Sequence, residues 1–200
     1  MACGELGGEV KPFVATEYNG VIEALRSKKL DVAYLGPFSY VLANSVAGAE
    51  AFAVAVTKKT GQSSYKSLII AQGQRLTPVA DLKGRNFAFA DPSSASGHLL
   101  PKAGLQQQGL DSEKFFGRVI FSGSHDASIL AVANKKVDAA AMADRILASA
   151  IASGKVKQED FVVLWTSRPI PEPPIVWRKD LDPALKEKPV KALGNLKDVK

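Results

Sequence analysis

The chain has 200 residues, with 26 Lys and Arg against 20 Asp and Glu, so that its formal net charge is +6 at pH 7. Hydrophobic residues make up 46% and charged residues 23% of the chain, which is typical of a globular fold and excludes wholesale disorder and collagen-like or coiled-coil character. No apolar run approaches the roughly 20 residues that a membrane-spanning helix needs. These values predict one large domain or two small lobes with a packed core.

The first predicted helix begins after Thr16, where apolar side chains follow the helical spacing i, i+3, i+4 and i+7: Tyr18, Val21, Ile22 and Leu25. A buried strand is predicted at residues 31–35, because a short apolar run there ends at a Gly-Pro turn. Further strands are expected at residues 13–15, 52–56, 67–71, 86–90, 119–121, 137–141 and 161–165. Further helices are expected at residues 38–47, 97–108, 127–134 and 145–153. This alternation predicts an α/β architecture with mostly parallel sheets.

A short internal repeat suggests how the elements are grouped. The segment Ser27-Lys28-Lys29-Leu30-Asp31-Val32-Ala33 returns as Asn134-Lys135-Lys136-Val137-Asp138-Ala139-Ala140, each time as a helix end, a lysine pair, an aspartate and a buried strand. We interpret the repeat as two lobes that contain the same helix-to-strand passage. Two such lobes would place a ligand site in the cleft between the carboxyl ends of their strands.

Cysteine and histidine are too few for the sites that they usually form. Cys3 is the single cysteine, which excludes an internal disulfide, and together with only His98 and His125 it leaves no credible metal site. We interpret Cys3 as an ordinary thiol, with a lipid-modified terminus as the alternative. The start of the chain lacks the basic and apolar regions of a secretion signal. The lysine pairs are scattered without interleaved aromatics, which argues against nucleic acid as a partner.

The segment Asp91-Pro92-Ser93-Ser94-Ala95-Ser96-Gly97-His98 lies between a predicted strand and a predicted helix. Free backbone N–H groups and the positive end of the helix dipole meet serine hydroxyls there, which predicts a cradle for a tetrahedral oxyanion. A plain serine N-cap is the competing interpretation. His125 stands at another strand-to-helix turn, where a capping or surface role is the alternative to a ligand contact.

Catalytic motifs are absent from the sequence. It contains no Gly-x-Ser-x-Gly elbow, no Gly-x-Gly-x-x-Gly or Walker loop and no His-Glu-x-x-His, so we predict neither an enzyme nor a cofactor. A triad of Ser94, His125 and Asp91 is the catalytic alternative that the sequence leaves open.

These segments together resemble the periplasmic phosphonate-binding subunits of ABC importers. The resemblance covers about residues 10–185 and rests on Glu17-Tyr18-Asn19-Gly20-Val21-Ile22, on Asp31-Val32-Ala33-Tyr34-Leu35-Gly36-Pro37, on residues 91–97, on His125 with residues 130–138, and on residues 170–179. It implies a two-lobed type II periplasmic binding fold with a hinge. It also implies a receptor that delivers phosphonate, phosphite or phosphate to an ABC permease, in the periplasm or anchored outside the cytoplasm. An oxyanion-sensing domain of a signalling system is the alternative.

The resemblance also assigns site residues and lobe boundaries. It implies ligand contacts from Tyr18, Ser94, the Ala95 N–H, Ser96 and His125, with Tyr34 lining the cleft. Relatives that take up aminoethylphosphonate bind its amine with two carboxylates, and the matching positions here hold Arg145 and Pro173, so we expect a ligand without an ammonium group. Lobe one is expected to comprise residues 1–72 plus 172–200, and lobe two residues 73–171. Because the chain is shorter than the family pattern, lobe one is expected to lack its first strand, and self-association is expected to cover the exposed edges.

Overall fold

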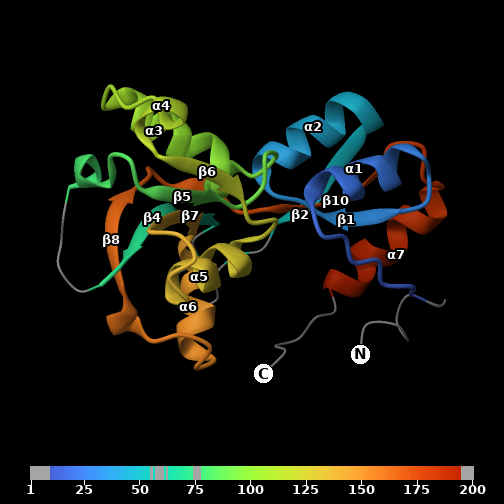
Figure 1. Ribbon diagram of the computed structural model, residues 1–200. Coiled ribbons are helices and arrows are strands. Elements are labelled where there is room, and N and C mark those ends of the chain that lie inside the picture. Colours follow the sequence, from blue (N-terminus) through green and yellow to red (C-terminus); the bar gives the residue numbers. More distant parts are fainter. Residues whose placement is uncertain (1–9, 55, 57–60, 62, 74–77, 195–200) are drawn as a thin grey trace.

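The computed structural model describes residues 10–54, 56, 61, 63–73 and 78–194. The described elements form two groups of helices around two separate sheets, which lie side by side (Figure 1). The α/β class and the two-part architecture expected from the sequence are confirmed. Cys3 lies outside the described residues. Within the described parts, no helix combines the length and hydrophobicity that crossing a bilayer requires.

The first sheet contains the antiparallel strands β1 (Val32–Tyr34), β10 (Pro174–Arg178) and β2 (Ala49–Val54), in that order. Helices α1 (Tyr18–Arg26) and α2 (Pro37–Ala47) cover one face, where their core side chains pack with those of the strands: Ile22, Leu25, Leu35, Ala43 and Val176. Trp177 alternates with the buried Val176 and therefore faces the other side of the sheet. Helix α7 (Pro183–Gly194) lies on that side, because its Lys186 ammonium stands 5.3 Å from the Trp177 ring.

The second sheet has the order β6-β5-β7-β4-β8, formed by Arg118–Phe121, Asn86–Phe89, Ala139–Ala143, Ser67–Gln72 and Phe161–Thr166. Helices cover both faces of this sheet, as alternate side chains of β4 show. Ile69 packs in the core on one face, together with side chains of α3 (Leu100–Gln107) and α4 (Ser112–Phe115). Ile70 packs in the core on the other face, together with side chains of α5 (His125–Ala133) and α6 (Asp144–Ala152). Shorter turns are η1 (Val79–Leu82), η2 (Ala95–Leu99) and η3 (Gln158–Asp160).

The sheets are not mostly parallel, so that part of the expectation is wrong. Only β5 pairs parallel with its neighbours β6 and β7, whereas β10 and β4 pair antiparallel on both sides. The reason is the path of the chain. Each of these two strands is the one that enters its half directly from the other half, so it begins at the cleft and runs against strands that end there. Because both lie between two other strands, each creates two antiparallel pairings.

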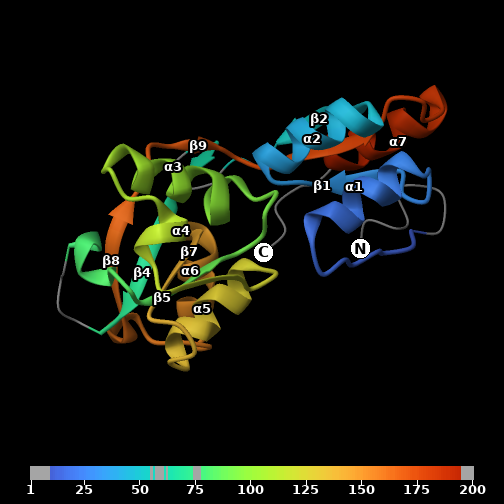
Figure 2. The ribbon, with the colours of Figure 1, turned by 45° about the horizontal axis from the view of Figure 1, so that its top comes forward.

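The chain crosses between the halves through a two-stranded antiparallel ribbon of β3 (Ser64–Tyr65) and β9 (Ile170–Pro171). Figure 2 shows the return crossing from β8 through β9 into the first half. Since β4 is part of the second sheet, the first crossing precedes Ser67 rather than lying near Gly73. The expected boundary after residue 72 is corrected accordingly.

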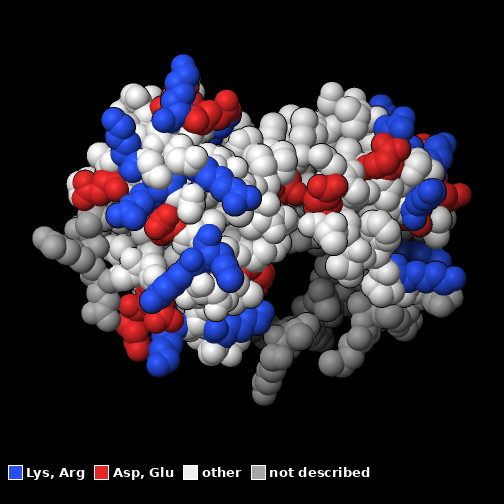
Figure 3. All heavy atoms as spheres, viewed as in Figure 1, with Lys and Arg blue, Asp and Glu red and all other residues white. Residues whose placement is uncertain are grey.

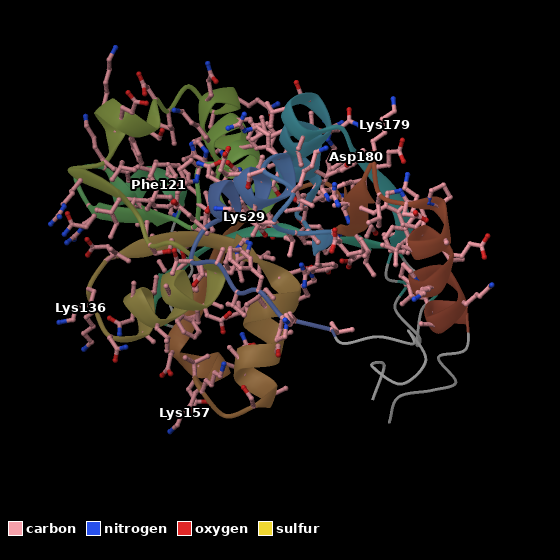
Figure 4. The ribbon with its side chains drawn as sticks, turned by 90° about the vertical axis from the view of Figure 1, so that its right-hand side faces the viewer. Lys29, Phe121, Lys136, Lys157, Lys179 and Asp180 are labelled. Carbon is pink, nitrogen blue, oxygen red and sulfur yellow. The ribbon has the colours of Figure 1, made fainter. Side chains whose placement is uncertain are left out.

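The internal repeat corresponds to one local conformation used twice. Lys28 and Lys135, at the same position of the two copies, have φ values of 59° and 58° and are the described non-glycine residues with positive φ. Each follows a helix end and precedes a backbone N–H that bonds back into that helix, Lys29 N to Ala24 O and Lys136 N to Ala131 O. Lys29 follows α1 in the first half and Lys136 follows α5 in the second, and Figure 4 labels both side chains. The expected helix-to-strand passage in each half is confirmed.

Further differences concern single elements. Residues 13–15 form no strand and instead line a cavity described below. β10 and α7 were not among the expected elements; prolines at 171, 173 and 174 disfavour a strand there, and Pro189 lies inside the helix. On the face drawn in Figure 3, Lys and Arg side chains are spread over both halves and interspersed with Asp and Glu.

Candidate functional site

A cavity of about 320 Å³ lies where the two halves meet. The first half contributes the segment before α1, the start of α1 and the end of β1, and the second half contributes the turns that follow β5 and β6. Its lining includes Phe13, Val14, Ala15, Thr16, Glu17, Tyr18, Val21, Tyr34, Ala90, Asp91, Gly123, Ser124, His125, Asp126 and Ile146. The cleft at the carboxyl ends of the strands is therefore where the repeat predicted it.

The structure brings the expected ligand residues into one region but gives them different depths. Tyr18, Tyr34 and His125 line the cavity directly. Ser94, Ala95 and Ser96 are not among the lining residues and are buried, with 2%, 5% and 1% of their surface exposed. The Ser94 hydroxyl stands 3.5 Å from His125 Nε2, which connects this serine turn to the cavity.

Ser94 is the N-cap of η2, as the competing interpretation held, and it lies beside the cavity as well. Its Oγ accepts a hydrogen bond from Gly97 N at 2.9 Å. The N–H groups of Ala95 and Ser96 have no partner within the helix because they belong to its first turn. Capping and anion binding are therefore compatible here, since the cap satisfies one N–H and leaves earlier ones available.

The Ser96 hydroxyl is buried and, among the described residues, has no hydrogen-bond partner of good geometry. The Tyr65 side chain is close by, and burial raises its pKa to about 12, while its interaction with Ser96 opposes this rise only in part. The two hydroxyls do not form a hydrogen bond of good geometry. A buried hydroxyl without a partner costs stability, so its retention beside a cavity points to a ligand contact.

His125 is held as a neutral side chain with a defined tautomer. Its Nδ1 accepts a hydrogen bond from the Ala143 N–H at 3.2 Å, so the ring proton lies on Nε2. Burial, reinforced by the Arg145 charge, lowers the pKa of His125 to about 4. The histidine therefore presents an uncharged Nε2–H donor toward Ser94 and the cavity at neutral pH.

The catalytic triad left open by the sequence is not formed. In a triad the histidine Nδ1–H donates to the aspartate, but here His125 Nδ1 is an acceptor for Ala143 N. The Asp91 carboxylate accepts from two backbone N–H groups instead, Tyr18 at 3.1 Å and Ser93 at 2.7 Å.

Asp91 connects the two halves, a role that the sequence did not reveal. It follows β5 in the second half, whereas its partner Tyr18 N is the first residue of α1 in the first half. A second bond across the cleft joins the Ser93 hydroxyl to Asn19 Oδ1 at 2.9 Å. With 2% of its surface exposed, Asp91 is a buried carboxylate whose oxygens both accept hydrogen bonds.

We expect Asp91→Asn to lower the free energy of unfolding by about 2 kcal/mol, because an amide replaces a charged acceptor and turns an NH₂ group toward a backbone donor. Urea unfolding measures the loss. Asp111→Asn is the matched control, since Asp111 accepts from Glu113 N as an exposed N-cap, where Asp and Asn are nearly equivalent. An equal loss in both variants would contradict the role assigned to Asp91.

Arg145 places a positive charge beside the cavity, at the start of α6. Its Nε lies 3.5 Å from Glu172 Oε2, and its guanidinium carbon stands 5.2 Å from the centre of the Tyr65 ring. Burial raises the pKa of Glu172, and the Arg145 charge opposes that rise. Among the described residues, no group of three or more His, Cys, Asp and Glu side chains is placed to hold a metal ion.

Two sheet-and-helix halves, a two-stranded crossing and a cavity at the strand ends define the type II periplasmic binding fold. A model of the ABC transporter phosphonate periplasmic substrate-binding proteins matches residues 3–198. The chain belongs to this family, whose members are the periplasmic substrate-binding components of phosphonate transporters.

Several relatives are similar over most of this chain. The phosphonates-binding periplasmic protein of Escherichia coli (strain K12) is 34% identical over 188 residues, which are 92% of this chain and 55% of that protein. The phosphate-import protein PhnD of Mycolicibacterium smegmatis is 32% identical over 174 residues, 82% of this chain and 54% of that protein. The chain thus spans about half the length of these curated relatives.

Two solved structures share the fold closely. A binding protein component of an ABC phosphonate transporter from Pseudomonas aeruginosa has a TM-score of 0.88 and 32% identity, over 95% of this chain and 64% of the other. PhnD1 from Prochlorococcus marinus, solved in complex with methylphosphonate, has a TM-score of 0.79 and 25% identity, over 95% of this chain and 72% of the other.

Proposed function

We propose that this chain binds a small tetrahedral phosphorus oxyanion, a phosphonate, phosphite or phosphate, in the cavity between its halves and hands it to an ABC importer without bond chemistry. The observation that carries the proposal is the Ser96 hydroxyl, buried beside the cavity without a partner of good geometry. The neutral Nε2–H of His125 and the free N–H groups at the start of η2 point to the same class of ligand. Uncharged donors and a helix start bind a tetrahedral anion by its shape.

The tyrosine assigned to the site fits an uncharged donor role as well. Tyr18 lines the cavity, and burial raises the pKa of its hydroxyl, so that it stays protonated at neutral pH. Its oxygen also lies 3.3 Å from where a Cβ on Gly36 would stand, close to the start of α2. The wider family supports the ligand class, since the relative from Prochlorococcus marinus was solved with methylphosphonate.

The ligand is proposed to carry no ammonium group. The guanidinium of Arg145 lies beside the cavity, and it would repel a second cation there. The paired Glu172 carboxylate already has this cation as its partner. Among small phosphorus oxyanions we therefore place methylphosphonate, phosphite and phosphate before aminoethylphosphonate.

We further propose that the two halves are the lobes of a hinged receptor. The β3 and β9 ribbon would be the hinge, and the bonds from Asp91 to Tyr18 N and from Ser93 to Asn19 would hold the closed arrangement. The closed lobes would present a surface to a membrane permease outside the cytoplasm, as the family relationship implies.

Ser96→Ala tests this function directly. We expect the affinity for methylphosphonate, phosphite or phosphate, measured by titration calorimetry, to fall about tenfold, the typical value of one hydrogen bond to a charged group. The free energy of unfolding should not fall, because the lost hydroxyl has no well-aligned partner in the free protein.

Ser112→Ala is the matched control for this test. Ser112 is also buried with an Oγ that has no described partner, but it lies in α4, away from the cavity. It should leave the affinity unchanged. Equal binding by wild type and Ser96→Ala, or binding of none of these anions by the wild type, would contradict the proposed function.

A further inference from the structure

Arg145 stands between the cavity and the crossing ribbon. It is the second residue of α6, and the next residue, Ile146, lines the cavity. Its two side-chain neighbours both belong to the crossing, since Tyr65 lies in β3 and Glu172 follows β9 directly. A cation therefore lies next to a lining residue of the cavity, on the side of the proposed hinge.

The pairing of this cation is incomplete. Arg145 Nε is buried but makes no hydrogen bond among the described residues, because Glu172 Oε2 stands at 3.5 Å without suitable alignment. A guanidinium offers five N–H donors in a planar fork that suits a bidentate carboxylate or phosphate. Glu172 therefore leaves the Nε donor without a well-aligned acceptor, and 34% of the Arg145 side chain is exposed. This arrangement leaves the guanidinium available to a further anionic group.

The charge of Arg145 acts on the lining of the cavity. Burial raises the pKa of Tyr18 and of Tyr34, and Arg145 is the group that most strongly opposes the rise in each. Both tyrosines line the cavity, as does His125, on which Arg145 also acts. The guanidinium is therefore electrostatically coupled to the space in which the oxyanion is proposed to bind.

The volume of the cavity leaves room for a substituent on the phosphorus. At about 320 Å³ it falls in the range of pockets for small organic ligands, about 300–1,000 Å³. A bare phosphite or phosphate would leave much of this space to water, whereas a phosphonate with a short side chain would occupy it.

We propose that Arg145 is a specificity-determining residue that binds a carboxylate on the substituent of a phosphonate, so that the cavity prefers a short carboxyalkylphosphonate to an aminoalkylphosphonate. This inference rests on the proposed function, because the phosphoryl group is held by the same serine turn and His125. Glu172 is the competing partner of Arg145 in the free protein, and the ligand carboxylate takes its place.

According to this proposal, replacing Arg145 and replacing Glu172 should have opposite effects on the binding of phosphonoacetate. Arg145→Gln removes the partner of the ligand carboxylate and should weaken binding of phosphonoacetate about tenfold or more, while methylphosphonate, which has no carboxylate, changes much less. Glu172→Gln removes the competitor and should strengthen binding of phosphonoacetate. A purely structural ion pair would instead make both variants bind every ligand more weakly.

The experiment is titration calorimetry of phosphonoacetate, methylphosphonate and 2-aminoethylphosphonate against the full chain and its variants. Wild type should prefer phosphonoacetate to 2-aminoethylphosphonate by about tenfold or more, and Arg145→Gln should abolish that preference. Arg145→Lys keeps the charge and should retain the preference in weaker form. Arg85→Gln is the matched control, because Arg85 pairs with Asp138 at 4.0 Å at the opposite, amino end of β5.

The outcomes separate the two proposals. If wild type binds methylphosphonate but does not prefer phosphonoacetate to the amine, or if Arg145→Gln and Arg145→Lys lower all three affinities alike, the role of Arg145 is overturned and the oxyanion receptor stands. If wild type binds none of the three ligands, the role of Arg145 is overturned. If it also binds neither phosphite nor phosphate, the proposed function fails as well. Thermal unfolding of each variant confirms that the protein titrated is folded.

Discussion

Gly97→Ala is expected to abolish oxyanion binding and to lower the free energy of unfolding by about 1–3 kcal/mol, the usual cost of overpacking. A Cβ on Gly97 would stand 2.5 Å from Ala90 Cβ and 3.0 Å from both His125 Cε1 and Ser94 Oγ. Ala90 cannot move away easily, because its backbone bonds to Gly97 O at 2.9 Å and to Gly123 N at 2.8 Å. The added methyl group must therefore displace the serine turn and the histidine, both of which belong to the proposed site.

Gly20→Ala separates this effect from a general effect of replacing glycine. Gly20 lies inside α1, and a Cβ there would make only an ordinary contact, 3.5 Å from Ala15 Cβ. Alanine favours a helix over glycine by about 1 kcal/mol, so this control should gain stability and keep binding. Urea unfolding measures the stability of both variants, and titration calorimetry measures their oxyanion binding. Retained binding in Gly97→Ala would show that the close packing of the serine turn on Ala90 is not needed for the site.

The sequence predicted those elements whose signals are local. Strands β4, β5, β6 and β8 lie within one or two residues of their expected positions, because each is a short apolar run with turn residues at its ends. The repeat located two equivalent helix ends, and the shared left-handed lysines show why its spacing is fixed. These features depend on neighbours in the sequence, and so they can be seen without a structure.

What the sequence did not predict depends on the path of the chain. The direction of β4 and β10 follows from where the chain crosses between the halves, and no local pattern records that crossing. The same is true of the central strand β10, whose flanking prolines argued against it. Its donors and acceptors are nevertheless paired with β1 and β2, because the prolines precede or begin the strand rather than interrupt it.

The candidate site likewise contains residues that the sequence pointed out and contacts that only the structure shows. The local pattern singled out the serine turn and His125 because both stand at strand-to-helix turns, and the family resemblance assigned Ser94, Ser96 and His125 to the ligand. The part that Asp91 plays required knowing that Tyr18, far away in the sequence, ends beside it. The sequence showed that Arg145 stands where the relatives that take up aminoethylphosphonate have a carboxylate. Only the structure shows that its partner Glu172 is poorly aligned.

His125→Ala is expected to weaken oxyanion binding about ten- to a hundredfold, because it removes an Nε2–H donor worth about 1.5–3 kcal/mol to a charged acceptor. His98→Ala is the matched control in calorimetry. His98 is the other histidine of the chain, and its Nδ1 lies 2.9 Å from Pro92 O rather than at the cavity. Equal losses in the two variants would contradict the assignment of His125 to the site.

The same histidine should make stability depend on pH in a predictable direction. Its folded pKa of about 4 lies below the ordinary 6.5, so between these values the unfolded chain binds a proton that the native protein does not. The contribution of the neutral His125 to the free energy of unfolding is therefore fully present above about pH 6.5. It is lost as the pH falls toward 4, by up to roughly 3 kcal/mol. Urea unfolding at several pH values should show a shallower acid loss in His125→Ala than in wild type. A wild-type slope that His125→Ala leaves unchanged would mean that His125 takes up its proton at the same pH in the native and unfolded chains, which would contradict its burial as a neutral acceptor of the Ala143 N–H.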